Sequence, residues 1–337
     1  MDDWIRHYQS AYSHLHPSPQ VQKVVAGMRP TSQSGHYVRR VSRVLVAALL
    51  LLALLGCGVA AVIYIEDIQG LFARRWQQLT GQSMAPEQSA LVERLSQEIN
   101  QSQTVNGVTV TLDSATVGDD VFYLLVRVED RDRIGRKGCS FENFDVQISP
   151  DPASQLQGIG GCGWSTQGTD EKGRSLFLVE HQYTAEDGSS FDPAPLQITL
   201  TLTNLCRGSG DDYQLLADGV WSFQAVLDRT QIPPPIHLSD IQAYVTDYFS
   251  EEVFEGTFTN IQVSSTGITY DQTFADGQFP DFFPVLVQLD GTEIPGANGF
   301  GSKLTEDTFR CTHQWSVPVD LTLAAAVRFG DTEIPIP

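Results

Sequence analysis

The sequence predicts a mainly β protein with two antiparallel β-sandwich domains, and three observations lead to that prediction. From residue 104 onward, short segments alternate apolar and polar residues, as strands with one buried face do. Gly, Asp, Pro and Ser turns separate these segments, with almost no helical pattern between them. About 238 residues follow position 99, more than the roughly 100 residues that one sandwich needs. Two domains are therefore expected.

The chain begins with a short tail, residues 1–43, whose first part is predicted to be helical. A helix this short cannot enclose a core, so its apolar face is expected to bind a partner or to lie at the membrane. The candidate partner-binding residues recur at helical spacing on that face: Ile5, Tyr8, Tyr12 and Leu15.

Residues 44–65 are predicted to be a transmembrane helix. These 22 residues carry no charge and no proline, and as a helix they would extend about 33 Å, close to the bilayer core of about 30 Å. A cleaved signal is one alternative, but the run is long and starts late for a signal. Lipid attachment at Cys57 is another, although the apolar run continues beyond that cysteine.

The charges beside the span predict its orientation. The flank before it carries Arg39, Arg40 and Arg43, and the flank after it begins with two acids. Cytoplasmic flanks are enriched in Lys and Arg, so the N-terminus is expected in the cytoplasm and the β domains outside. The part from residue 100 on has 34 acidic and 12 basic side chains, which disfavours nucleic acid and anionic lipid as its partners.

Residues 66–100 are predicted to form a helical stalk, or else the first helices that pack on the outer domains. Helical patterns cover residues 68–80 and 86–99. The second pattern begins with Pro86, which is favourable in a first turn. Its apolar stripe consists of Leu91, Leu95 and Ile99.

The two sandwich domains are expected at 101–231 and 237–337, joined by "IPPPI" at 232–236, whose prolines remove backbone donors and stiffen a linker. Strand candidates in the first domain are 105–112, 121–128, 144–148, 175–183, 196–202 and 221–227. Those in the second are 258–263, 267–271, 283–289, 313–317 and 324–329. The second also contains two similar turn-and-strand phrases, "LDGTEIP" at 289–295 and "FGDTEIP" at 329–335.

Four cysteines lie in the outer part: Cys139, Cys162, Cys206 and Cys311. An even number permits two disulfides, with three connectivities. We predict a Cys139–Cys162 bond, which would close a glycine-rich loop within the first domain. No Cys-x-x-Cys occurs among them, so a structural zinc site is not expected.

The outer part offers no catalytic signature. Its histidines are His181, His237 and His313, and no serine lies in a Gly-x-Ser-x-Gly motif. The nearest calcium-loop pattern starts at Asp130 but has Phe141 at its twelfth position, where an acid is needed. We therefore predict no enzyme, no metal and no cofactor.

Two acidic turns and one tryptophan complete the search for binding residues. "VGDD" at 117–120 and "RGSGDDY" at 207–213 are predicted to be solvated turns rather than calcium ligands. Trp221 and Trp315 lie between alternating apolar residues, which is typical of a sandwich core. Trp164 follows glycines in a predicted surface loop and is the candidate ligand contact.

Several segments resemble a known family. After a short tail with "HPSPQVQKVVAGM" and a single span, "INQSQTVNGVTVTLDSATVGDDVFYLLVRVED" at 99–130 resembles an uncharacterised extracytoplasmic domain of Gram-positive, single-pass, anti-sigma-factor-like membrane proteins. The second domain, with "IQVSSTGITYD" at 261–271 and "WSVPVDL" at 315–321, looks like the immunoglobulin-like domain that follows in that family. The resemblance implies that both sandwiches are immunoglobulin-like.

The same resemblance implies a transmembrane regulator, whose tail holds a cytoplasmic sigma factor while the outer domains sense or bind an envelope component. The zinc-binding anti-sigma module uses a His and a Cys-x-x-Cys, and residues 1–43 contain no cysteine. A sigma factor would therefore meet a zinc-free helix. The alternative is a surface binding or adhesion module that holds the cell wall or another protein, with the tail as an anchor.

Overall fold

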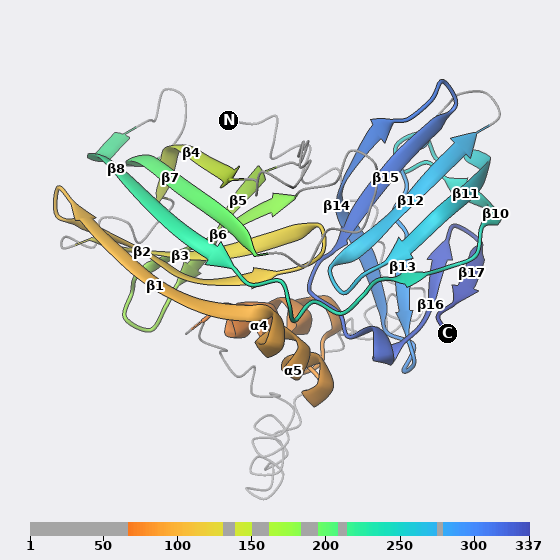
Figure 1. Ribbon diagram of the computed structural model, residues 1–337, viewed down its shortest axis with the longest axis horizontal. Helices are drawn as coiled ribbons and strands as arrows, with labels where there is room; N and C mark the ends of the chain where they lie inside the picture. Colours follow the sequence, from red (N-terminus) through yellow and green to blue (C-terminus); the bar gives the residue numbers. More distant parts are fainter. Residues whose placement is uncertain (1–66, 131–138, 150–161, 183–194, 208–213, 275–278) are drawn as a thin grey trace, which may run out of the picture. The chain divides into compact units, whose positions relative to one another are not determined.

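The computed structural model shows a mainly β protein with antiparallel sheets (Figure 1). All the residues that it describes belong to one compact unit, residues 61–337. The described ranges are 67–130, 139–149, 162–182, 195–207, 214–274 and 279–337. The tail and the predicted span at 44–65 lie outside these ranges, and none of the helices inside them is long and apolar enough to cross a membrane.

Two helices come first, α4 (Ile68–Thr80) and α5 (Pro86–Leu95). The Asp67 carboxylate caps α4 by accepting a hydrogen bond from Gly70 N at 2.7 Å, and Gly81 ends it in the left-handed conformation. The expected helix at 68–80 is confirmed. The helix expected at 86–99 ends four residues early, because Ser96 and the residues after it leave α5 to pair with a strand.

The first β region, residues 96–227, has two sheets, which we call the first sheet and the second sheet. The first sheet has the order β1-β2-β3-β6-β5 and the second the order β4-β7-β8, and every pairing is antiparallel. The bounds are β1 Ser96–Val105, β2 Val108–Val117, β3 Val121–Asp130, β4 Cys139–Ser149, β5 Cys162–Thr169, β6 Ser175–Gln182, β7 Leu196–Arg207 and β8 Gln214–Leu227. Apolar side chains from both sheets form one buried core, in which Trp221 is fully buried.

The edges of these two sheets meet where β1 lies beside β8. Glutamine side chains of β1 bond to the backbone of β8: Gln101 Nε2 donates to Gln224 O at 2.7 Å, and Gln97 Nε2 donates to Val226 O at 3.2 Å. Gln103 bonds to both the N–H and the carbonyl of Ser222. These amides satisfy backbone groups that an open sheet edge would leave unpaired. The polar sequence of β1 therefore has a structural role.

The second β region is a third sheet of nine strands, β9–β17. Its order is β10-β11-β12-β15-β14-β13-β16-β17, and β9 pairs with β11. The bounds are β9 Ile236–His237, β10 Ile241–Thr246, β11 Val253–Val263, β12 Gly267–Phe274, β13 Val285–Gln288, β14 Glu293–Lys303, β15 Thr308–Trp315, β16 Ala324–Phe329 and β17 Thr332–Pro335, with a 3-10 turn at Leu321–Leu323.

Two features of the third sheet relate to sequence expectations. The two "TEIP" phrases occupy equivalent positions, since the hairpins β13–β14 and β16–β17 lie side by side and bury Ile294 and Ile334. The expected linker contributes to the sheet, because Ile236 at its end pairs with Val263 of β11. Strand β14 links the two parts of this path, since residues 293–295 pair with β13 and residues 296–303 pair with β15.

A second core joins α4, α5 and the two β regions. In β3, Phe122 and Leu124 face the core shared with the second sheet, whereas Tyr123 and Leu125 belong to this second core, where Phe72 of α4 packs edge-on against Tyr123 at 5.2 Å. The same cluster contains side chains of the third sheet. The helices at 68–95 are thus packing helices, and the alternative of a separate stalk is not what these residues form.

We predict that Gln103→Ala lowers the free energy of unfolding by about 0.5–1.5 kcal/mol, because two hydrogen bonds to the backbone of Ser222 are exchanged for bonds to water at this exposed edge. Urea unfolding followed by tryptophan fluorescence measures the change. Gln147→Ala is the matched control, since this β4 side chain bonds only to the exposed Asp145. Equal stability of the two variants would contradict the role assigned to the β1 glutamines.

Candidate functional site

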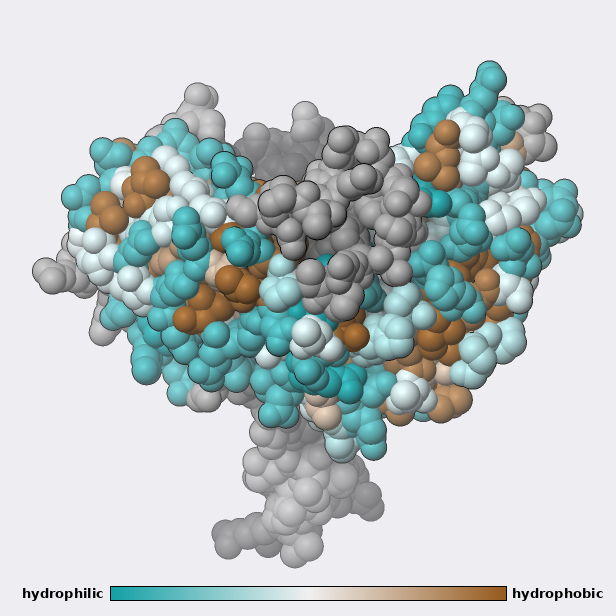
Figure 2. All heavy atoms as spheres, in the orientation of Figure 1, coloured by the Kyte–Doolittle hydropathy of each residue, from teal (hydrophilic) through white to brown (hydrophobic). Residues whose placement is uncertain are grey.

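Three aromatic side chains form an exposed cluster, which we call the aromatic surface: Tyr248 and Phe249 in the turn between β10 and β11, and Phe283 just before β13. Phe249 is 78% exposed, and its ring meets Tyr248 edge-on at 5.3 Å. Tyr248 in turn meets Phe283 edge-on at 5.9 Å. Apolar side chains reach the visible face of the molecule only in separate patches among hydrophilic ones (Figure 2). An exposed group of three aromatic rings is therefore a candidate binding surface.

The turn that carries Tyr248 and Phe249 is held by the carboxylate of Asp247. One oxygen, Oδ1, accepts hydrogen bonds from Phe249 N at 3.0 Å and Ser250 N at 2.6 Å, and Oδ2 accepts one from Asp281 N at 2.7 Å. The backbone N–H of Ser250, helped by those of Asp281 and Phe249, holds the pKa of Asp247 below its usual value. The carboxylate therefore stays ionised at neutral pH, and the two rings are presented on a preorganised turn.

A column of rings connects the aromatic surface with the core below it. Phe283 meets His313 edge-on at 5.6 Å, and His313 stacks on Tyr270 at 5.8 Å with the planes 8° apart. Burial lowers the pKa of His313 to about 4, so the imidazole is neutral at physiological pH. The base of the surface thus consists of packed, uncharged rings.

A second candidate is the turn between β2 and β3, where Asp119 and Asp120 adjoin Arg229. Asp120 is buried, and Thr266 Oγ1 donates to its Oδ1 at 3.1 Å. Burial raises the pKa of Asp119 to about 6, and burial together with the Asp119 charge raises the pKa of Asp120 to about 7. The prediction of a solvated turn at 117–120 is therefore wrong, because Thr266 of the second β region covers it. The companion turn at 207–213 lies mostly outside the described residues.

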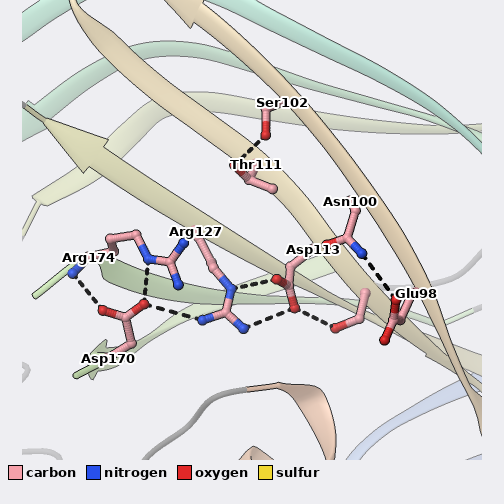
Figure 3. A network of polar contacts seen from close by, with 9 residues as sticks. Glu98, Asn100, Ser102, Thr111, Asp113, Arg127, Asp170 and Arg174 are labelled. Carbon is pink, nitrogen blue, oxygen red and sulfur yellow. Dashed lines mark hydrogen bonds and ion pairs between the residues drawn. The ribbon is translucent and has the colours of Figure 1, made fainter. Parts of the chain in front are cut away.

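A third polar cluster is structural. Arg127 of β3 lies between two carboxylates: its Nε donates to Asp113 Oδ1 at 2.6 Å, and its Nη1 donates to Asp170 Oδ2 at 3.3 Å (Figure 3). Arg174 completes the network through Nε to Asp170 Oδ2 at 2.5 Å. Because each of the four charges faces an opposite charge, the network stabilises the end of the sheet and leaves no group for a ligand.

The structure places the candidate ligand contact Trp164 in strand β5, rather than in the loop expected for it. Its ring is half-buried, 5.5 Å from Phe177 and 6.0 Å from Phe144. These contacts make Trp164 part of the packing between the two sheets. The residues that precede it, 150–161, lie outside the described ranges.

The predicted disulfide between Cys139 and Cys162 is not formed in this structure, where the four described cysteines make no disulfide. Cys139 lies buried in β4 of the second sheet, and Cys162 starts β5 of the first sheet, where it is exposed. The two cysteines of the predicted bond thus belong to different sheets.

Other predicted site residues fall outside the described part of the chain. These are the tail residues Ile5, Tyr8, Tyr12 and Leu15. Within the described ranges, no group of three or more His, Cys, Asp or Glu side chains is placed to hold a metal ion.

Sequence reasoning missed the aromatic surface. The signal available was "TDYFSEE" at 246–252, in which two adjacent aromatic residues follow an Asp in a turn. Phe283 lies 34 residues beyond Phe249, so its place beside Tyr248 depends on the contacts of Asp281 with the turn. A second sequence signal for this surface was the lack of basic residues around it, since no Lys or Arg occurs from 230 to 302.

Comparisons with known proteins find similarity at the level of structure and not of sequence family. No family model matches the chain, and no curated protein matches it. Among solved structures, the chain is similar to the crystal structure of a conserved domain protein from Bacillus anthracis, with a TM-score of 0.47 and 12% sequence identity. The likeness covers 70% of this chain and 77% of that one.

The Asp119–Asp120 pair predicts a pH-dependent stability. The folded-state pKa values, about 6 and about 7, exceed the ordinary unfolded values near 4. The folded protein therefore keeps protons that the unfolded chain releases, and its free energy of unfolding falls as pH rises from about 4 to 7. Asp120→Asn keeps an oxygen acceptor for Thr266 and removes the charge. At pH 8 it should be more stable than wild type by on the order of 2–4 kcal/mol.

Urea unfolding at pH 5 and pH 8 tests this prediction. Asp218→Asn, an exposed carboxylate in β8, is the control and should follow the wild type at both pH values. Equal stability of Asp120→Asn and wild type at pH 8 would show that the Asp120 charge is not disfavoured in the folded protein.

Proposed function

We propose that this protein is a membrane-anchored binding protein, whose described part lies outside the cell and holds an envelope component at the aromatic surface. The observation that carries the proposal is the exposure of Tyr248, Phe249 and Phe283 on a turn fixed by the Asp247 hydrogen bonds. A group of exposed aromatic rings is more typical of a binding surface than scattered apolar side chains are, and a preorganised turn lowers the entropy lost on binding. We assign no catalysis to the protein.

The anchor in this proposal is the run at 44–65, with the N-terminus in the cytoplasm. It is supported by the length of the uncharged run and by the basic residues before it. We also propose that the first β region is an immunoglobulin-like sandwich of the extracytoplasmic family described above. The support is the packing of two antiparallel sheets around one core that includes the buried Trp221.

Retention on isolated cell envelopes tests the binding role. The full chain in an uncharged detergent is incubated with envelopes, and the fraction that sediments is measured. We expect Phe249→Ala to lower retention at least threefold, because that side chain is mostly exposed and touches only Tyr248 among the described rings. Leu289→Ala is the matched control, since Leu289 is 70% exposed and lies outside the aromatic surface. Equal retention of both variants and wild type would refute the proposal.

A regulatory role of the anti-sigma-factor type is the second candidate, favoured by the apolar stripe of the tail. In that case an occupied aromatic surface outside would alter a sigma factor bound inside. Co-purification of the full chain from its native cells tests it. A sigma factor should accompany the wild type and be lost when Ile5, Tyr8 and Tyr12 are changed to Asp. A sigma factor that accompanies both, or neither, would leave the tail as an anchor only.

A further inference from the structure

The stretch of sequence that carries the aromatic surface is rich in acidic residues and contains no basic one. Residues 230–302 contain ten Asp and Glu and no Lys or Arg. Next to Phe249 lie the exposed Glu251 and Glu252, and Asp281 is exposed beside Phe283. Two of the ten are paired with bases from elsewhere in the chain, Asp271 with Arg310 and Glu293 with Arg328. Among the described residues Glu251, Glu252 and Asp281 form no ion pair, so these three carboxylates leave a negative potential around the rings.

The apolar and acidic side chains continue from the turn along the outer face of β10 and β11. Tyr244 is paired with Glu255, and Thr246 with Val253. Tyr244, Val253 and Glu255 are exposed, and residues two apart on a strand lie roughly 7 Å from each other. The surface therefore extends over several residues, with carboxylates spaced between apolar groups.

We propose that the occupant of the aromatic surface is a cationic peptide segment, in which Lys or Arg side chains alternate with small or apolar ones. The inference rests on the proposed binding function and names its ligand class. Aromatic faces attract ammonium and guanidinium groups, and nearby carboxylates strengthen that attraction. Several carboxylates spread over two strands and a turn match several spaced cations, which a peptide provides and a single ammonium ion does not.

The same charges disfavour other occupants. A second copy of this chain carries a net charge of −20 and would be repelled, as would an anionic lipid or a polyanionic wall polymer. A neutral glycan could stack on the rings but would gain nothing from the carboxylates. Charge complementarity therefore selects the cationic peptide among these classes.

Fluorescence anisotropy with two labelled octapeptides tests the inference on the full chain in uncharged detergent, with empty micelles as the blank. One octapeptide alternates Lys and Ala, and the other alternates Gln and Ala. We expect the Lys peptide to bind at least tenfold more tightly than the Gln peptide. Its affinity should fall at least fivefold in Phe249→Ala and in the double variant Glu251→Gln, Glu252→Gln, and remain unchanged in Leu289→Ala.

Three outcomes would overturn the inference, and each is distinct from failure of the binding function. Equal binding of both peptides would mean that the surface recognises apolar groups without regard to charge. Binding of the Lys peptide that is unaffected by Phe249→Ala would mean diffuse attraction to an acidic chain. Absence of peptide binding, with envelope retention still dependent on Phe249, would mean a neutral ligand. Loss of the Phe249 dependence in both assays would refute the binding function itself.

Discussion

The burial of strand β3 on both faces is the constraint on which the rest of the structure depends. Alternate side chains of its run "VFYLLV" belong to two different cores, with Phe122 and Leu124 in one and Tyr123 and Leu125 in the other. A strand with two apolar faces must be covered twice. The second sheet covers one face. The helices α4 and α5 cover the other, which explains why they are packed rather than extended.

This arrangement makes the residues next to the predicted span part of the folded body. Ile68 and Phe72 of α4 are fully buried in the core that also contains Tyr270 of the third sheet. Gln88 of α5 adds polar contacts: its Nε2 donates to Pro318 O, and its Oε1 accepts from Asp320 N at 2.7 Å. Since Tyr270 stacks on His313 below the aromatic surface, one packed body extends from that surface to α4. Such a body can hold a ligand at a fixed position relative to the helices α4 and α5.

The positions of most strands along the chain could be predicted from local patterns, and the strands that were missed have physical causes. The segments at 121–128 and 175–183 were predicted as strands because apolar and β-branched residues dominate them. The helical pattern at 86–99 extends over the first residues of strand β1. The glutamines of β1 show no apolar alternation that would indicate a strand, and their partners in β8 lie more than 100 residues away. Strand β5 is an edge strand with mostly exposed side chains, so it carries no burial pattern.

The candidate site was harder to predict than the fold, because its parts are brought together by contacts between distant residues. The burial of Asp120 depends on Thr266, which lies 146 residues away. The aromatic surface needs Asp281 to bond to the turn at 247–250, 34 residues earlier. By contrast, Trp164 was conspicuous in the sequence, but its ring packs against Phe144 and Phe177 within the protein. A tryptophan beside a run of glycines, such as Trp164, is therefore not enough to identify a binding residue from the sequence.

Backbone hydrogen exchange of the full chain tests the central claim most directly, by comparing the amides of α4 with those of β3. If α4 is part of the core that covers β3, the amides of Phe72 and its neighbours should exchange nearly as slowly as those of Leu124, because both open only when the shared core opens. Exchange of α4 within seconds, while β3 stays protected for hours, would show that the helices are a separate stalk and would contradict the account.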